Sequence, residues 1–158
     1  MQPVRILVAD DHEVVRRGVR SLLNSRTDWE VCGEAADGKE AVEKAKELKP
    51  DVIVMDISMP RLNGLEATRV IRKEVPQSEI LIFSQHAAAE MRPVALQAGA
   101  KEYIAKSAIS NDLLTAVESL SQRVVVSGSS QHHRAFDQAK ACAEIGSSVP
   151  VRGARKTY

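Results

Sequence analysis

The sequence is poor in aromatic residues and in cysteine, and it contains no long hydrophobic run. Phe, Trp and Tyr make up 3% of the 158 residues, and there are two cysteines. Cys32 and Cys142 lie far apart and form no Cys-x-x-Cys pair, so neither a disulfide framework nor a zinc site is expected. No apolar run approaches the roughly 20 residues that cross a bilayer, and the amino terminus does not resemble a signal peptide. We therefore expect a cytoplasmic protein without a membrane partner.

The chain also lacks an excess of charge of one sign, with 22 basic and 21 acidic side chains. Coating nucleic acid or anionic lipid requires a clear basic excess, so the composition argues against either as the main function. The balance is uneven along the chain. Residues 1–122 carry 16 basic and 19 acidic side chains, whereas residues 123–158 carry 6 and 2. Because the second region is also rich in Ser and Gly, we predict a compact domain at 1–122 and a basic, largely flexible extension at 123–158.

Strand-like apolar segments alternate with helical patterns throughout residues 1–122. Strands are expected at 4–9, 29–35, 51–55, 79–83 and 101–105, and helices at 14–23, from a cap at Asp37 to before Pro50, and at 63–74, 87–98 and 110–120. This alternation predicts an α/β fold with a five-stranded parallel sheet and helices on both faces. The first, third and fourth strands are the most apolar and suit the centre of the sheet. The expected strand order is 2-1-3-4-5, a doubly wound, flavodoxin-like, three-layer arrangement. Cys32, in the second strand, is expected to be a small core residue.

Polar side chains follow four of these strands at the point where each strand ends. The first strand ends at Asp10 and Asp11, the third at Asp56, the fourth at Ser84 and the fifth at Lys106. Neighbouring strands lie about 5 Å apart, so these side chains should converge in one acidic pocket. Carboxylates are ligands for Mg²⁺, and the lysine and serine could hold the oxygens of a phosphoryl group. Each residue alone has a structural explanation, as a helix cap, a strand end or a solvated lysine, but their joint placement favours a functional site.

The motifs at these strand ends are similar to those of the receiver domains of two-component response regulators. They are DDHE at 10–13, MDISMPRLNG at 55–64, FS at 83–84 and YIAK at 103–106, and the resemblance covers about residues 1–122. The nearest likeness is to the NarL/LuxR-type branch, whose members carry a helix-turn-helix output domain.

The resemblance implies that Asp56 accepts a phosphoryl group from the phosphohistidine of a sensor histidine kinase. Asp11 and Asp56 would bind Mg²⁺ directly, together with the backbone carbonyl of Ser58, and Asp10 would act largely through a bound water. The protein would then be a signalling switch rather than a conventional enzyme, limited to its own phosphorylation and a slow autodephosphorylation.

The resemblance also implies a conformational response. Ser84 would hydrogen-bond to the phosphoryl group and draw its loop inward, Tyr103 would move from an exposed to a buried position, and Lys106 would bridge to the phosphoryl oxygens. An interior proline removes a helix hydrogen bond, so Pro93 predicts that the fourth helix starts late or is kinked.

The sequence says least about the molecule that the chain acts on after phosphorylation. A LuxR-type DNA-binding module needs more than about 50 residues, whereas 123–158 offers one short helical pattern at 134–145. Residues 124–126 could dock on the domain or pair with an edge strand. DNA binding by this chain alone is therefore not expected, and the switch would control an unknown protein partner. The branch resemblance suggests a homodimer through the first and fifth helices.

Three alternative functions stay open. The chain could be a DNA-binding transcriptional regulator that acts through its tail or through a missing C-terminal module. It could be a magnesium phosphatase, although the Asp-x-Asp motif of that class is incomplete at Asp56. It could also bind FMN, although Asp10 and Asp11 occupy the turn where a flavin phosphate would need hydroxyls and glycine.

Overall fold

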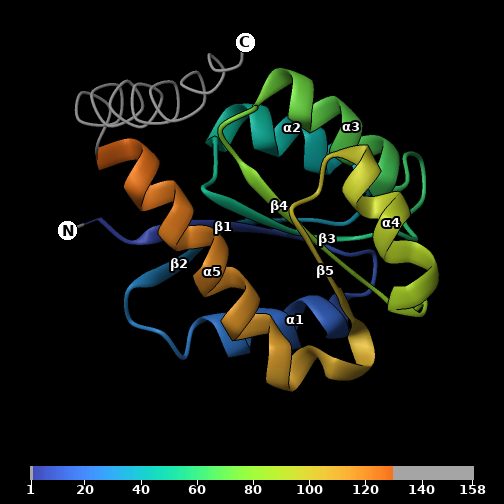
Figure 1. The fold of residues 1–158 in the computed structure, drawn as a ribbon, viewed down its shortest axis with the longest axis horizontal. Coiled ribbons are helices and arrows are strands. Elements are labelled where there is room, and N and C mark those ends of the chain that lie inside the picture. The colour runs from blue at the N-terminus through green and yellow to red at the C-terminus, as the bar shows by residue number, and fades with distance from the viewer. Residues whose placement is uncertain (1, 130–158) are drawn as a thin grey trace, which may run out of the picture. The chain divides into compact units, whose positions relative to one another are not determined.

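The computed structural model describes residues 2–129, and it describes the backbone alone over 123–129. Five strands alternate with five helices (Figure 1). The strands are β1 (Val4–Ala9), β2 (Trp29–Ala35), β3 (Val52–Asp56), β4 (Glu79–Ser84) and β5 (Glu102–Ala105). The helices are α1 (Glu13–Leu23), α2 (Gly38–Leu48), α3 (Gly64–Glu74), α4 (Ala88–Ala98) and α5 (Ile109–Ser129), with a short 3₁₀ turn at Lys106–Ala108 before α5. Among the described helices, none is long and apolar enough to cross a membrane.

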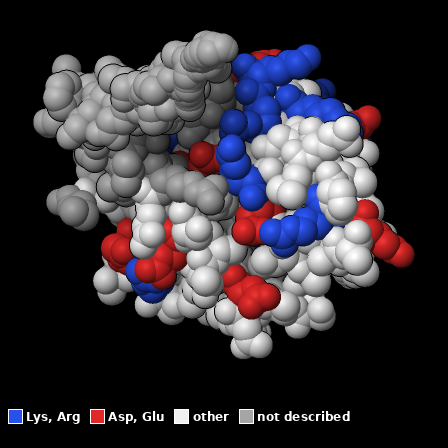
Figure 2. All heavy atoms as spheres, in the orientation of Figure 1, with Lys and Arg blue, Asp and Glu red and all other residues white. Residues whose placement is uncertain are grey.

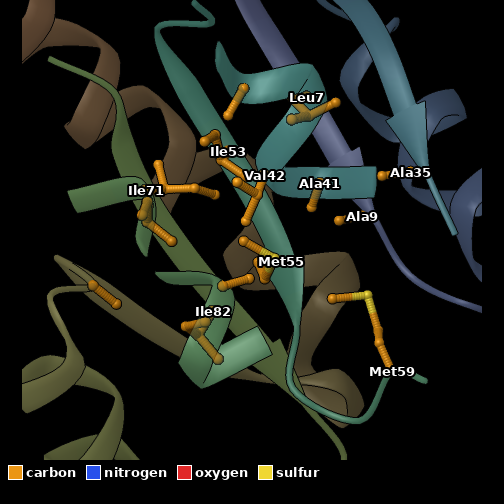
Figure 3. Packing of buried hydrophobic residues seen from close by; sticks show 14 of the residues in the cluster. Leu7, Ala9, Ala35, Ala41, Val42, Ile53, Met55, Met59, Ile71 and Ile82 are labelled. Carbon is orange, nitrogen blue, oxygen red and sulfur yellow. The ribbon is translucent and has the colours of Figure 1, made fainter. Parts of the chain in front are cut away.

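All five strands form one parallel sheet in the order β2-β1-β3-β4-β5, which confirms the predicted fold class and strand order. Helices cover both faces (Figure 1), with α2, α3 and α4 on one face and α1 and α5 on the other. Alternate residues of the central strands therefore enter two different cores. Leu7, Ile53 and Ile82 pack beneath α2 and α3 (Figure 3), whereas their neighbours pack beneath α1 and α5. Burial on both faces explains why these strands show no polar alternation.

The fourth helix corrects one expectation. Helix α4 runs from Ala88 to Ala98 with Pro93 inside it, so the predicted late start is wrong. Pro93 cannot donate to the carbonyl of Ala89, four residues earlier. Both residues are exposed, so water can satisfy that carbonyl and the helix tolerates the proline.

The last helix corrects a second expectation. Helix α5 was predicted to end at Leu120, but its backbone continues to Ser129. Residues 124–126 are thus helical, which excludes pairing with an edge strand, one of the two possibilities that the sequence left open. An α-helix propagates readily along a segment that contains neither Gly nor Pro. The segment from Leu120 to Ser127 contains neither residue. The remaining expectations for the extension, including the helical pattern at 134–145, lie outside the described residues.

Cys32 also differs from its expected place in the core. The pairing of β1 with β2 shifts register between Ile6 and Leu7, so that Val31 and Gly33 pair with β1 while Cys32 is left over. A bulge of this kind turns the extra residue out of the regular alternation. Cys32 is only half-buried, as are its neighbours Val31 and Gly33, and this partial burial raises the pKa of its thiol.

Candidate functional site

The carboxyl ends of the central strands bring two aspartates together. Asp56 is the last residue of β3, and Asp10 directly follows β1, whose last residue Ala9 pairs with Met55. Both aspartates are buried, and the amide of Asp10 donates to the carbonyl of Ala35 at 3.0 Å. The parallel register therefore holds two carboxylates at one sheet edge, as the sequence predicts.

Lys106 reaches this pair from the end of β5. Its Nζ atom lies 2.8 Å from Asp10 Oδ2 and 3.5 Å from Asp56 Oδ1, and its side chain is 14% exposed. The ammonium also lies 5.0 Å from the centre of the Phe83 ring. A desolvated lysine between two carboxylates is held by charge-assisted hydrogen bonding and, more weakly, by the aromatic face. One cation thus faces two anions within the pocket.

The pKa of Asp56 reflects the balance of charges in the pocket. Burial and, secondarily, the charge of Asp10 raise the pKa of the Asp56 carboxyl above its usual range. Lys106 and a hydrogen bond from the backbone of Ser58 act in the opposite direction but do not cancel the rise. The pocket therefore has uncompensated negative charge, which a hard divalent cation would neutralise. The oxygen-rich donor set fits Mg²⁺ in chemistry and in charge.

His12 joins the acidic group and was not among the predicted site residues. Ligand atoms of Asp10, Asp11 and His12 all lie within 4.8 Å of one another. His12 Nδ1 is 3.1 Å from Asp11 Oδ1, and the His12 amide donates to Asp10 Oδ1 at 2.8 Å. The adjacency of the three residues in the sequence was the available signal, but only the turn after β1 folds the ring back over the carboxylates.

Ser84 and Tyr103 lie on β4 and β5, the two strands that follow β3 in the sheet. Ser84 ends β4 and is buried, and its Oγ accepts a hydrogen bond from the amide of His86 at 3.2 Å. Tyr103 is 2% exposed, and its hydroxyl donates to the carbonyl of His86 at 2.7 Å. The expected exposed position of Tyr103 is therefore not observed. The ring packs in the core under α2, α3 and α4, and the His86 carbonyl satisfies the hydroxyl that burial would otherwise leave unpaired.

The loop after Asp56 is held closely against the strand that precedes it. The amide of Gly64 donates to the carbonyl of Ile57 at 2.8 Å, and a Cβ atom on Gly64 would overlap the carbonyl oxygen of Asp56. Only glycine allows this approach. Asn63 then caps α3 through a hydrogen bond from the amide of Glu66 at 2.9 Å. The loop therefore returns directly to a helix, with Ser58 kept near the Asp56 carboxylate.

Comparisons with known proteins agree with this geometry. The family model for the response regulator receiver domain matches residues 6–118. The response regulator protein VraR of Staphylococcus aureus is 43% identical over 119 residues, which cover 75% of this chain and 57% of VraR. The chain thus spans little more than half the length of these curated relatives.

Solved structures show the same similarity. The response regulator domain of Thermotoga maritima CheB has a TM-score of 0.72 at 36% identity, covering 77% of this chain and 98% of that one. A two-component response regulator of the LuxR family from Aurantimonas sp. SI85-9A1 has a TM-score of 0.73 at 39% identity, covering 77% of this chain and 86% of that one.

Proposed function

Because the chain belongs to the response regulator receiver domain family, we propose that Asp56 is the residue that accepts a phosphoryl group. The observation that carries this proposal is the placement of Asp56 at the end of β3, beside the Lys106 ammonium, which also contacts the Asp10 carboxylate. Burial and the neighbouring Asp10 carboxylate raise the pKa of Asp56, because the charge of its carboxylate is poorly compensated. A divalent cation would compensate that charge, together with the further negative charge that a phosphoryl group brings.

The donor in this proposal is the phosphohistidine of a sensor histidine kinase. One Oδ atom of Asp56 forms a bond to phosphorus while the bond from phosphorus to the imidazole nitrogen breaks. The electron pair stays on that nitrogen, which takes up a proton, and Asp56 becomes an aspartyl phosphate. A carboxylate is a weak nucleophile, so positioning and charge neutralisation supply the catalysis. Hydrolysis of the aspartyl phosphate would reset the switch, and we assign no further enzymatic turnover to the chain.

Asp11, Asp56 and the Ser58 backbone carbonyl are proposed to bind Mg²⁺ directly, with Asp10 acting through a bound water. The cation would neutralise charge on the transferred phosphoryl oxygens. Lys106 would move from its contact with Asp10 toward those oxygens, over a distance that its flexible stem allows. The side chain already lies within 3.5 Å of Asp56, which supports this role.

Ser84 and Tyr103 are proposed to carry the response. Ser84 Oγ, now bonded to the His86 amide, would turn to the phosphoryl oxygen. The loop that includes His86 would move with Ser84. The carbonyl of His86 in this loop also accepts the hydrogen bond from the Tyr103 hydroxyl. A change at the phosphoryl group would thereby reach Tyr103 on β5 and the loop before α4, and we propose that this region contacts the protein partner.

We propose that the chain acts in the cytoplasm and that phosphorylation favours a homodimer through α1 and α5. Two features of this face support the dimer. Val14 on α1 is 79% exposed, more than any other large hydrophobic side chain among the described residues. Beside it lies a hollow of about 480 Å³ between α1 and the start of α5, lined by Val15, Leu22 and Ile109 among others. Sedimentation analysis with and without an acyl phosphate would test this assembly.

The central proposal is tested by incubating the full chain with Mg²⁺ and acetyl phosphate and measuring the intact mass. The expected result is the addition of one phosphoryl group, lost in Asp56→Asn. Asp51→Asn is the matched control, since Asp51 lies at the opposite end of β3 and bonds to the Arg5 amide. Modification that persists in Asp56→Asn, or none in the wild type, would contradict the proposal.

A second candidate function is DNA-binding regulation through sequence beyond the receiver domain. This function is favoured by the fact that the match covers only 57% of the length of VraR, and that the chain is similar to a response regulator of the LuxR family. These relatives give no support to the expectation that DNA binding is absent. Figure 2 shows basic side chains gathered in a band on the face that it draws, with acidic side chains mostly at the margins of the band. Salt-sensitive binding of the full chain to a mixed-sequence duplex would favour this second function.

A further inference from the structure

An ion pair joins the start of α2 to the loop that follows Asp56, here called the 57–63 loop. The Nε and Nη2 atoms of Arg61 both lie 3.0 Å from Asp37 Oδ2. Asp37 is nearly buried, with 9% of its side chain exposed, and this contact spans 24 residues of sequence. Asp37 caps α2, as its sequence position predicts, and Arg61 contacts it from the loop.

Asp37 is itself held rigidly. Its Oδ1 atom accepts a hydrogen bond from the amide of Glu40 at 2.8 Å, and Glu40 Oε1 accepts one from the amide of Ala36 at 2.8 Å. These reciprocal bonds fix the first turn of α2. The bond from the Glu40 amide, together with the bond from Arg61, also holds the pKa of Asp37 below its usual range against the opposing effect of burial. Asp37 thus presents Oδ2 as a fixed acceptor.

Arg61 adopts a backbone conformation that an arginine rarely takes. Its φ is +70°, in the left-handed region, which costs a side-chain-bearing residue about 1–3 kcal/mol unless the surroundings enforce it. The next residue, Leu62, meets α2 so closely that a Cβ atom on Gly38 would overlap the Leu62 carbonyl. The ion pair and this close contact hold the same turn of the loop from one side.

The rest of the 57–63 loop is restrained from the other side. The amide of Met59 donates to the carbonyl of Ile57 at 3.1 Å, and the Met59 side chain lies in the core cluster with Ala9 and Ala35 (Figure 3). Ser58, which bonds to the Asp56 carboxylate, lies between Ile57 and Met59. A displacement of Arg61 would therefore be transmitted to Ser58 through a short, restrained segment.

We propose that Asp37 and Arg61 form a positioning pair, which holds the 57–63 loop so that Ser58 keeps its place beside Asp56. This inference rests on the proposed function, because it concerns the cation and phosphoryl chemistry of that same site. Neither residue touches the reacting atoms. Their effect is on the apparent affinity for Mg²⁺ and the rate of Asp56 phosphorylation, which both depend on the Ser58 carbonyl and amide.

The variants are chosen to separate positioning from folding. Asp37→Asn keeps a good helix cap and removes the charge that binds Arg61. Arg61→Ala removes the other partner, and Arg61→Lys keeps the charge but loses the paired donors. Lys46→Ala is the matched control, because the Lys46–Glu74 pair at 3.0 Å joins α2 to α3 near the last turns of both helices, away from the 57–63 loop.

The first readout is the initial rate of Asp56 phosphorylation by acetyl phosphate across a Mg²⁺ series. Loss of groups that orient metal ligands weakens metal affinity or activity by about 10–100-fold. We expect the half-saturating Mg²⁺ concentration to rise by about 10-fold in Asp37→Asn and Arg61→Ala. Arg61→Lys should recover part of the shift, and Lys46→Ala should match the wild type. Unchanged Mg²⁺ dependence in both disrupting variants would overturn the proposal.

The second readout is hydrogen exchange of a peptide covering the 57–63 loop in Mg²⁺-free protein, which is independent of phosphorylation. We expect faster exchange of the Met59 and Leu62 amides in the two disrupting variants and no change in Lys46→Ala. Equal exchange in all variants would show that the pair does not hold the loop. A wild type that is not phosphorylated would instead contradict the proposed function, while loop exchange would still decide whether the pair positions the loop.

Discussion

The ammonium of Lys106 lies 2.8 Å from the carboxylate of Asp10, although 96 residues separate them in the sequence. The contact closes the acidic pocket from the β5 side and compensates the buried Asp10, which has no exposed surface. Because a second carboxylate, Asp56, shares the same lysine at 3.5 Å, any change at Lys106 alters the balance of the whole pocket.

Replacing Lys106 by methionine should destabilise the Mg²⁺-free protein. Removing one partner of a buried ion pair leaves an uncompensated charge and costs about 3–5 kcal/mol. We expect urea unfolding to show a loss of this order at pH 7, with part of it recovered when Mg²⁺ is added. Arg17→Met is the control, because Arg17 pairs with Glu13 in a mostly exposed contact that contributes little. A Lys106→Met protein as stable as the wild type would show that the pair does not stabilise the pocket.

Replacing Asp56 by asparagine should stabilise the Mg²⁺-free protein at neutral pH. The pKa of Asp56 is raised in the folded state, first by burial and then by the charge of Asp10. The folded protein therefore holds this proton more tightly than the unfolded chain, and the ionised carboxylate opposes folding as pH rises from 3.8 through the folded pKa. Asparagine removes that opposition. The free energy of unfolding, measured from pH 3 to 7, should favour the variant only in the upper part of the range.

Asp37 should show the opposite pH dependence. Its pKa is lowered, first by the hydrogen bond from the Glu40 amide and also by Arg61, against an opposing effect of burial. Its contribution to stability is therefore complete above pH 3.8 and is lost as pH falls through the lower folded pKa. Asp37→Ala should cost about 1 kcal/mol at pH 7, the usual value of a helix cap. The difference from the wild type should shrink below pH 3.8, and a constant difference would argue against an ionised cap.

Replacing Tyr103 by phenylalanine tests its hydrogen bond to the His86 carbonyl. The ring would keep its place in the core, while the carbonyl would lose a donor at 2.7 Å. We expect a loss of about 1 kcal/mol in the free energy of unfolding, the net value of a typical hydrogen bond. Hydrogen exchange at 84–87 should rise in the same variant. Unaltered exchange there would indicate that Tyr103 does not restrain this loop.

The sequence determined the fold because the patterns that predict strands and helices are local and recur along the chain. Apolar strands without polar alternation predicted burial on both faces of the sheet. Asp37 and Asn63 predicted the starts of two helices, and their side chains cap those helices by accepting hydrogen bonds from the amides of Glu40 and Glu66. The strand order followed from which strands carry charge. The convergence of Asp10 and Asp56 followed from parallel pairing alone, since Ala9 pairs with Met55. Local periodicity and sheet geometry suffice for these inferences.

Tertiary structure decided the features that depend on contacts across the chain. The bulge that leaves Cys32 unpaired arises from a register shift between β1 and β2, which no local pattern encodes. The burial of Tyr103 depends on an acceptor at His86, and the fold of the turn after β1 brings His12 onto the acidic group. The pair between Asp37 and Arg61 requires an arginine in a left-handed conformation. Such contacts form only when segments that are distant in the sequence pack together. The backbone strain at a residue such as Arg61 persists because these tertiary interactions offset its energetic cost.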